Sequence, residues 1–597
     1  MNLRKLQAVA WAVFSASLLA MHCNRAGLSA HGDGGGLAGA AGSGQGLFGG
    51  FGGMAGSGEA SGTGSGGTQI VSTQAIGADG LLYDTWSTMA LVAVSQDERH
   101  VAFMRDFLPL PDRGPEPDYS GCAMRVGTLL VATIADDGTV AVRVVGQGVN
   151  FDSVGFSADS RSMAYVDGRD PCLIGGVLKI AAADGSNPRT IGSVPISLED
   201  RIIGNTLQFL MPPVADANTQ STLGEPGYVL RLPDGAPISV PGPYGDLDGW
   251  ISQDGRRAGY VDAAGNLIVV DVSTGASHQV DLGLGTSALN YTVFLRWSPN
   301  SGFFTAEETP NHGGQYGLAV AAAGDTKAHI LAQNGLPQNE VFSPDSSRLA
   351  YQTLDGADAP DLVVRSLAAG TDVHVQGLPN PAGSINTFSF SPDGAMLLVT
   401  ATDSASYVMS LYRGSADGSG SLQLVTSGTT GFFAMPPGDG NVAVELNAGY
   451  TQVFSFNGTD SNLLPGNHPV YEPNSAQPRL LLYPLSQASA SNPVSAFVLA
   501  STDGTNMKTV VLPTGASLGG PIPQWMGHTV IYGFSPALTG AFPAIYAWTG
   551  DSSSPPLLAA GPDTYAWAPI PVPTRLFYAR VAANSAGPAG LWMVSLP

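Results

Sequence analysis

The sequence predicts an all-β fold built from about eleven similar units. Three observations support this prediction. A short turn motif returns about every 47 residues along the chain. Gly (78 residues) and Pro (43 residues) are abundant, and both disfavour helix interiors. No segment past residue 30 shows a sustained period of 3.6 residues, the signature of a helix. Short strands joined by tight turns are therefore the expected structure.

The N-terminus has the order of an export signal. Two basic residues precede an uncharged apolar stretch from Leu6 to Met21, and Cys23 follows. Cys23 resembles the lipidation cysteine of bacterial lipoproteins, although Ala20 and His22 stand where such signals prefer a leucine and a small residue. We expect residues 1–23 to be a signal peptide with a lipidation site at Cys23. Ordinary cleavage nearby and free secretion are the alternative.

Residues 24–67 are expected to be a disordered linker. Half of residues 32–67 are glycine, so too little apolar surface is available there to offset the loss of backbone entropy on folding. No later stretch has the roughly 18 uninterrupted apolar residues of a membrane span. Contact with a membrane is therefore expected only through an anchor at Cys23.

The repeat is clearest in two copies of one turn. Each copy has an aromatic residue, then Ser-Pro-Asp and a small residue, and leads into an apolar strand. Proline presets φ for the first central position of a type I turn, and aspartate can accept hydrogen bonds from neighbouring backbone N–H groups. The motif residues are Ser343, Pro344 and Asp345 in one copy and Ser391, Pro392 and Asp393 in the other.

Variants of this turn mark further units. Taking the serine or its equivalent as the marker gives positions 95, 157, 197, 252, 298, 343, 391, 435, 472, 526 and 568. This spacing suits the four-stranded blade of a β-propeller, which needs roughly 40–50 residues. A second turn, such as Ala183-Asp184-Gly185, follows a later apolar strand in several units and is typical of a hairpin.

The Ser-Pro-Asp turns, followed by strands of the Arg348-Leu349-Ala350-Tyr351 type, resemble the WD40-like repeats of the TolB family of periplasmic propellers. The same repeat occurs in the propellers of prolyl oligopeptidase-like proteins. The resemblance covers roughly residues 85–420, and residues 430–597 with eroded copies. It implies sheets arranged radially around a channel, and commonly protein binding in the cell envelope. It specifies the architecture of a blade rather than an activity.

Eleven units are many for one ring, because the family often has six or seven blades. We therefore favour two tandem propellers, residues 68–378 and 379–597, separated where Pro379 and Pro381 interrupt the pattern. One large ring is the alternative. The last unit lacks a fourth strand, so residues 69–73 are expected to pair there and to close a ring without an exposed edge.

Cys122 and Cys172 are the other two cysteines, and they lie in equivalent loops of neighbouring units. Exported proteins meet oxidising conditions, so a disulfide between them is expected. Two free, half-buried thiols are the alternative. Five tryptophans stand before strands or turns, which predicts core packing between blades, with a ring of aromatics at a channel mouth as the alternative. They are Trp86, Trp250, Trp297, Trp525 and Trp567.

The search for catalytic or metal-binding residues yields only weak candidates. Residues 515–519 read Gly-Ala-Ser-Leu-Gly, the letters of a hydrolase elbow, but Pro521 and Pro523 follow and cannot begin a regular helix. The histidines are scattered without metal-ligand spacing, and His312, in an inter-strand loop, is the best single candidate. Acidic pairs such as Asp136-Asp137 lack the spacing of a calcium loop and are interpreted as turns. We expect no catalytic residue, cofactor or metal.

The net charge of −22 makes nucleic acid an unsuitable partner, because such a surface repels phosphates. The expected function is an exported cell-envelope scaffold that binds an unidentified envelope protein or peptide. It would reside in the periplasm, on the outer membrane as a lipoprotein, at the cell surface or outside the cell. An enzyme or carbohydrate-binding protein that uses a pocket at the propeller axis is the alternative, and a structural or adhesion role is a third.

Overall fold

The fold is described from a computed structural model, which covers most of the chain after residue 67. All elements in the described part are β-strands, 43 in number, so the predicted all-β class is confirmed. The described residues are 68–72, 89–105, 126–150, 153–168, 176–194, 201–210, 227–240, 251–261, 267–283, 291–310, 316–355, 359–378, 382–435, 441–447, 450–455, 461–472, 478–483, 496–511, 516–517, 524–526, 528–536, 544–549, 557–560, 564–566, 573–580 and 590–596.

Consecutive strands pair antiparallel into small sheets in the first part of the chain. In the first two of these units, the Ser-containing turn joins the inner strand to the second strand. The first four units are β2 (Met89–Val94), β3 (His100–Arg105), β4 (Val126–Ile134) and β5 (Val140–Asn150); β6 (Val154–Phe156), β7 (Ser162–Asp167), β8 (Gly176–Ala182) and β9 (Arg189–Val194); β10 (Arg201–Ile203), β11 (Thr206–Leu210), β12 (Gly227–Arg231) and β13 (Ile238–Val240); and β14 (Arg257–Val261), β15 (Leu267–Asp271) and β16 (Ser277–Val280).

The middle of the chain contains one sheet of seven strands that spans two repeat units. Its long strand β20 pairs with β19 through its first half and with β21 through its second half. The strands are β17 (Tyr291–Trp297), β18 (Phe303–Pro310), β19 (Tyr316–Ala322), β20 (His329–Phe342), β21 (Arg348–Asp355), β22 (Ala359–Ser366) and β23 (Thr371–His374), followed by the unit of β24 (Ala382–Phe390), β25 (Met396–Asp403), β26 (Met409–Ser415) and β27 (Gln423–Ser427).

The last part of the chain forms further sheets of the same kind, although its turn motifs are eroded. These strands are β28 (Thr429–Ala434), β29 (Asn441–Leu446), β30 (Tyr450–Ser455) and β31 (Ser461–Pro465); β32 (Asn467–Tyr471), β33 (Arg479–Tyr483), β34 (Ala496–Ser501) and β35 (Lys508–Val511); β36 (Ala516–Ser517), β37 (Gln524–Met526), β38 (Thr529–Pro536), β39 (Ala544–Trp548) and β40 (Leu557–Ala560); and β41 (Thr564–Ala566), β42 (Arg575–Arg580), β43 (Gly590–Ser595) and β1 (Thr68–Ser72).

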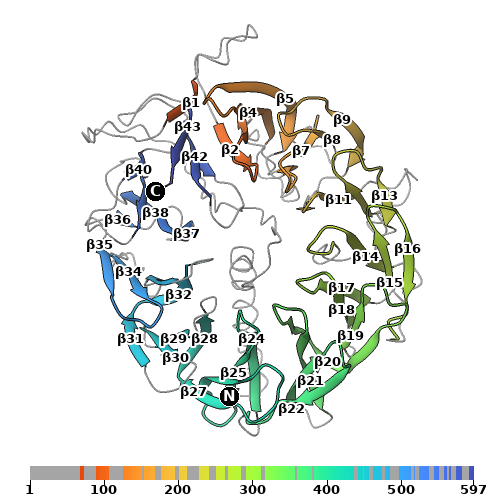
Figure 1. The fold of residues 1–597 in the computed structure, drawn as a ribbon, viewed down its shortest axis with the longest axis vertical. Coiled ribbons are helices and arrows are strands. Elements are labelled where there is room, and N and C mark those ends of the chain that lie inside the picture. Colours follow the sequence, from red (N-terminus) through yellow and green to blue (C-terminus); the bar gives the residue numbers. More distant parts are fainter. Residues whose placement is uncertain are drawn as a thin grey trace, which may run out of the picture.

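These sheets stand side by side around one centre, and the chain runs once around the circle from β2 to β43 (Figure 1). The inner strands face the centre and the outer strands form the rim. The chain is a β-propeller. Within the described ranges, no helix has the length and apolar character that a membrane span requires.

The hydrophobic core lies between neighbouring sheets rather than in one central layer. For example, Phe497 of β34 packs against Tyr532 of β38 and Trp548 of β39, with ring centroids 4.8 and 5.5 Å apart. Phe497 and Trp548 are fully buried, and burying side chains of this size contributes roughly 1.5–3 kcal/mol each. Each sheet therefore depends on the next one for its core.

The structure has the alternative arrangement, one ring, and not the favoured two tandem propellers. Packing continues across the expected boundary at residues 378–379, because Leu362 and Val364 share a core cluster with Ile385 and Phe388 of the next unit. The prolines that suggested a boundary, Pro379 and Pro381, stand in the sequence between β23 and β24, outside the described residues. Prolines end a unit as readily as they end a domain, so they could not distinguish the two arrangements.

The first and last units meet and close the ring. Phe103 of β3 and Phe577 of β42 lie in one buried cluster. β1 pairs antiparallel with β43, with Thr68 opposite Met593 and Ser72 opposite Gly590. The expected pairing of residues 69–73 with the last unit is thus confirmed for residues 69–72, and the strand also includes Thr68. An N-terminal strand therefore completes the C-terminal sheet and covers the edge of β43.

Candidate functional site

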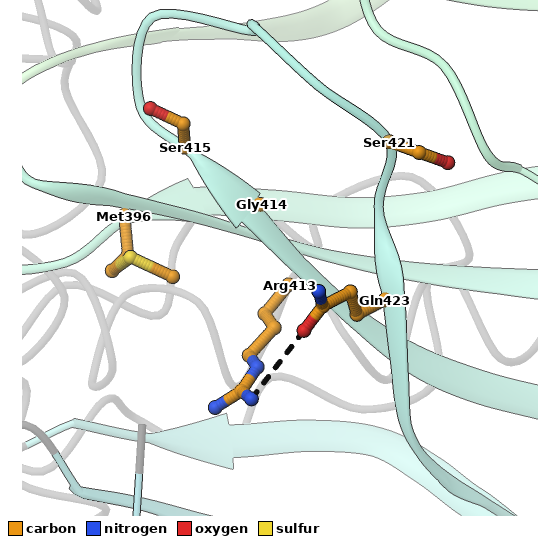
Figure 2. A pocket seen from close by; sticks show the side chains of 6 residues that line it. All are labelled: Met396, Arg413, Gly414, Ser415, Ser421 and Gln423. Atoms are coloured by element: carbon orange, nitrogen blue, oxygen red, sulfur yellow. Dashed lines mark hydrogen bonds between the residues drawn. The ribbon is translucent and has the colours of Figure 1, made fainter. Parts of the chain in front are cut away.

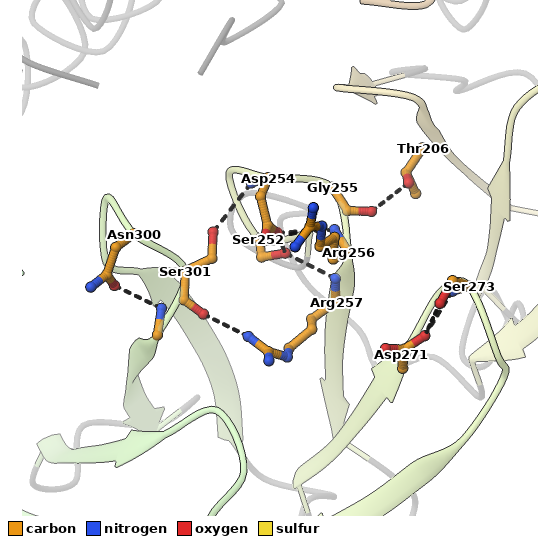
Figure 3. Close-up of polar contacts among 11 residues, drawn as sticks. Thr206, Ser252, Asp254, Gly255, Arg256, Arg257, Asp271, Ser273, Asn300 and Ser301 are labelled. Atoms are coloured by element: carbon orange, nitrogen blue, oxygen red, sulfur yellow. Dashed lines mark hydrogen bonds and ion pairs between the residues drawn. The ribbon is translucent and has the colours of Figure 1, made fainter. Parts of the chain in front are cut away.

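The Ser-containing turns have one shared hydrogen-bond pattern, which Figure 3 shows around Ser252. The hydroxyl of Ser252 donates to Oδ1 of Asp254 at 2.7 Å and accepts from the backbone N–H of Arg257 at 2.9 Å. Oδ1 of Asp254 also accepts from the backbone N–H of Arg256 at 3.0 Å. One serine and one aspartate thus satisfy the backbone donors of a tight turn, as Asx and Ser turns do.

The predicted motif residues form this pattern. Ser343 donates to Asp345 at 2.6 Å and accepts from Arg348 N–H at 2.9 Å. Ser391 makes the equivalent contacts with Asp393 and with the N–H of Met396, which lies 2.9 Å away. Six described turns share the Ser-to-Asp or Ser-to-Asn hydrogen bond, and all six serines are at most 1% exposed. The six serines are Ser95, Ser157, Ser252, Ser298, Ser343 and Ser391.

The residue three positions after this serine connects one unit to the preceding one. Ser301 adopts a φ of 57° and accepts a hydrogen bond from the N–H of Asp254 at 3.2 Å (Figure 3). Ser160 and Ser346 have the same φ and accept from the turns before them. A positive φ costs a non-glycine residue about 1 kcal/mol or more. The contact between units holds these serines in that conformation.

Glu98 occupies the same position in the first unit and joins it to the last one. Its φ is 56° and its side chain is buried. Oε1 accepts from the N–H of Thr574 at 2.7 Å and from the N–H of Arg575 at 3.1 Å, and the Thr574 hydroxyl donates to Oε2. The Arg575 guanidinium also donates to the Glu98 carbonyl, as Arg257 does to that of Ser301. Glu98 therefore repeats the contact between units at the ring closure.

A charged cluster replaces the serine motif in the β32–β35 unit. The Glu472 carboxylate is 2% exposed, accepts from Nε of Arg479 at 2.9 Å and lies 2.6 Å from Nδ1 of His528. The Arg479 guanidinium also donates to the His528 and Thr549 carbonyls and lies 5.0 Å from the Trp525 ring centroid. This cluster joins two neighbouring units, and 69% of the His528 side chain is exposed.

Hydrogen bonds lower the pKa of several aspartates in turns. Hydrogen bonds from Ser419 and Ser415 lower the pKa of Asp417 to about 2. Burial acts to raise the pKa of Asp345, but hydrogen bonds from Ser343 and Ser347 outweigh it and lower the pKa overall. A carboxylate that accepts several hydrogen bonds is more acidic because those bonds favour its charged form. Asp137, from one of the acidic pairs, likewise accepts from Thr139 in a turn.

A polar hollow of about 200 Å³ lies on the β24–β27 sheet. Figure 2 shows Arg413 of β26 and Gln423 of β27 side by side in it, with Nη2 of Arg413 donating to Oε1 of Gln423 at 3.5 Å. Met396, Gly414, Ser415 and Ser421 complete the described lining. Arg413 is the one charged residue among these six, so the hollow presents a positive group together with hydroxyl and amide donors.

The large apolar side chains that the structure exposes are concentrated on one part of the ring. Of the eight in the described residues, seven lie between positions 373 and 507, and Val144 is the other. We call these seven the apolar arc. They are Val373, Tyr407, Val408, Leu424, Tyr450, Leu463 and Met507. Leu424 and Leu463 lie on the outer strands β27 and β31 and are 58% and 59% exposed.

The remaining candidates from the sequence have mixed outcomes. Cys23, Cys122, Cys172 and His312 lie outside the described residues, so lipidation, the disulfide and the histidine remain predictions. Ser517, the serine of the elbow-like letters, lies in the short strand β36, which pairs with β38. In the described ranges, no group of three or more His, Cys, Asp or Glu side chains is arranged to hold a metal ion.

Two of the five tryptophans are described, and both pack in the core as predicted. Trp297 and Trp525 are 4% and 5% exposed and belong to clusters between units. Sequence reasoning did not single out Glu98, Glu472, His528 or Arg413. The alignment of the turns offered one signal, because Glu98 stands where Ser160 and Ser346 stand in other copies. The sequence offers no such signal for Arg413, because the residues around it in the hollow come from three different strands.

Comparisons with known proteins give likeness in structure only. No protein-family model matches the chain, and no curated protein matches it. A putative TolB from Agrobacterium tumefaciens matches with 15% identity, 46% of this chain, 83% of that chain and a TM-score of 0.24. The β-propeller domain of the trilobed protease from Pyrococcus furiosus matches with 10% identity, 49% and 91% coverage and a TM-score of 0.28.

An oligogalacturonate lyase from Vibrio parahaemolyticus also matches, with 11% identity, 57% and 97% coverage and a TM-score of 0.27. The chain is similar to TolB-type and other propellers. Its neighbours include enzymes as well as TolB proteins. Likeness at this level carries no information on activity.

Proposed function

We propose that this chain is an exported scaffold that binds another protein or a peptide through the apolar arc. The apolar arc is the observation that supports this proposal. Contiguous exposed apolar surface on a folded protein marks an interaction site more often than scattered single residues do. Seven such side chains lie on consecutive units, against one in the rest of the described chain.

The contacts between turns support the same function, because they join consecutive units of the ring to one another. Ser160, Ser301 and Ser346 each tie a turn to the turn before it. A surface carried by a rigid framework loses little conformational entropy when a partner binds. The frame is therefore suited to presenting side chains rather than to closing around a substrate.

Site-specific photo-crosslinking in living cells tests the proposal. A photoreactive residue replaces Leu424 or Leu463 in the arc, and Val144 outside the arc in a control, all in the full chain. We expect one or a few cross-linked products of defined mass from the two arc positions and none from the control. The proposal fails if the arc positions give no product, or the same products as Val144.

We also propose that export depends on residues 1–23 and that Cys23 carries a lipid. The support is the order of basic residues, apolar stretch and cysteine in the sequence. Labelling bacterial cells that express the chain with a radioactive fatty acid should mark the wild-type protein and leave Cys23→Ser unlabelled. Equal labelling of both proteins, or of neither, would exclude the anchor, while fractionation of the same cells tests export separately.

A further inference from the structure

Strand β27 has an open outer edge beside the polar hollow. β27 is the last strand of its sheet and pairs through its inner edge with β26. Among the described strands, none pairs with its outer edge. Its sequence, QLVTS, contains neither a charged residue nor proline, the residues that commonly protect an edge strand from pairing. Leu424 exposes 58% of its surface there.

The neighbouring unit blocks this edge at one end. The N–H of Leu422 donates to the carbonyl of Gln376 at 2.7 Å, and Gln376 forms a parallel bridge with Ser421. An added strand can therefore pair only from Gln423 onward. Because β27 begins at Gln423, an antiparallel partner would have its carboxyl end there. On β26, Arg413 lies opposite Gln423 in the strand register. The carboxyl end of an added strand would therefore lie beside the polar hollow.

The hollow has the chemistry to receive a carboxylate. The Arg413 guanidinium is a planar donor that matches a carboxylate in geometry and charge. Ser421 and the Gln423 amide, at the same end of β27, can donate further hydrogen bonds. Nη2 of Arg413 donates to Gln423 at 3.5 Å, and its Nη1 donates to the Ser455 carbonyl at 3.4 Å. Both contacts are long, whereas charge-assisted hydrogen bonds to carboxylates are roughly 2.7–2.9 Å. A carboxylate would thus form a stronger contact than the amide oxygen does.

We propose that the outer edge of β27 binds an extended peptide as an added antiparallel strand. The terminal carboxylate of the peptide lies against Arg413, and an apolar side chain of the peptide covers Leu424. Backbone hydrogen bonds supply affinity that depends little on sequence, and the carboxylate fixes the register. This inference rests on the proposed function, since it names the partner of one segment of the apolar arc.

Affinity selection from peptide pools tests the inference. The purified full chain is immobilised and offered a pool of random hexapeptides with free terminal carboxylates, or the same pool as terminal amides. Retained peptides are quantified by mass spectrometry. We expect about tenfold more retention from the acid pool, which is the effect of one charge-assisted contact. Retained peptides should be rich in alternating apolar residues.

Matched variants locate the site. Arg413→Gln should remove the preference for the acid pool, and Arg413→Lys should restore part of it because the charge returns. Leu424→Lys should lower retention of both pools several-fold, whereas Val144→Lys, on the outer strand β5 and outside the apolar arc, should leave both unchanged. The melting temperature of each variant is measured alongside, so that a misfolded variant is recognised.

Equal retention of the acid and amide pools by the wild-type chain overturns the inference without any variant. An unchanged acid preference in folded Arg413→Gln also overturns it, as does the absence of retained peptides from both pools. The photo-crosslinking experiment remains independent of these outcomes. Cross-links at Leu463 without peptide retention would leave the binding scaffold in place and reject β27 as a peptide site.

Discussion

The backbone N–H of Thr574 donates to Oε1 of Glu98 at 2.7 Å, although 476 residues of sequence separate them. Elsewhere in the ring, the serine at this position of a turn accepts a hydrogen bond from the unit before it in the chain. Glu98 makes the same kind of contact, but it joins the first unit to the last one. The carboxylate accepts two backbone N–H groups and one hydroxyl, where each of those serines accepts a single N–H. The closure is therefore the most strongly hydrogen-bonded of these contacts between turns.

Replacing Glu98 should open the ring at this point. Glu98→Ala removes the carboxylate that accepts from the Thr574 and Arg575 N–H groups, and hydrogen bonds to charged groups contribute roughly 1.5–3 kcal/mol each. We expect a lower midpoint of urea unfolding and faster protease cleavage near the two ends of the chain. Ser160→Ala, which loses one such contact between adjacent units, should have a smaller effect. Equal effects of the two substitutions would contradict a special role for Glu98 in closure.

Removing the N-terminal strand should destabilise the ring in a second way. Deleting residues 68–84 takes away β1 and leaves the outer edge of β43 without its described partner. The melting temperature should fall sharply and the chain should aggregate, because exposed edges pair with other chains. Calorimetry and light scattering measure the two effects. A deletion of residues 32–48, of equal length in the glycine-rich segment, is the control, and an unchanged melting temperature after loss of β1 would refute the closure.

The turns and the closing strand could be predicted from sequence because both depend on local rules. Ser343 and Asp345 form a turn through their own neighbours, and a unit that lacks a strand requires one from elsewhere. The number of rings could not be predicted in this way. Pro379 and Pro381 mark the end of a unit equally well in one ring or two. The shared core of Leu362 and Phe388, together with the closure between the first and last units, decides between the two arrangements.

The candidate sites were less predictable because distant residues assemble them. Glu472 and His528 are 56 residues apart and meet across the boundary between two units. Arg413 and Gln423 approach through strand register, and the hollow beside them also needs Met396 and the small residue Gly414. Where the repeat motif is eroded, the spacing of residues along the chain no longer predicts contacts of this kind. The sequence therefore predicts the propeller fold better than the candidate sites on its surface.

The buried turn serines should contribute to stability through hydrogen bonds rather than through packing. Ser343→Ala deprives the Arg348 N–H of its acceptor and Asp345 of a donor, which should cost about 1–2 kcal/mol of unfolding free energy. Ser391→Ala should cost a similar amount, since its contacts are equivalent. Ser347→Ala, at a half-buried position of the same turn, is the control and should cost less. Urea titrations of the three variants compare them, and a larger loss for Ser347→Ala would contradict the turn model.

Acid should weaken the fold as the turn aspartates become protonated. The pKa of Asp417 is lowered to about 2 by hydrogen bonds from Ser419 and Ser415, whereas an unfolded aspartate titrates near roughly 3.9. A group with a depressed pKa stabilises the folded state above its unfolded pKa, and this contribution is lost as the pH falls from about 4 to about 2. Asp417→Asn should therefore flatten the dependence of unfolding free energy on pH in that window. Near neutrality the variant should be less stable than the wild type, because it lacks the contribution of the ionised carboxylate. Ser419→Ala removes a hydrogen-bond donor to Asp417, which should raise the pKa of Asp417 and so also reduce the pH dependence of stability in this window. Urea midpoints measured from pH 2 to pH 7 test this, and an acid response equal to that of the wild type in both variants would show that the Asp417 turn adds nothing to acid sensitivity.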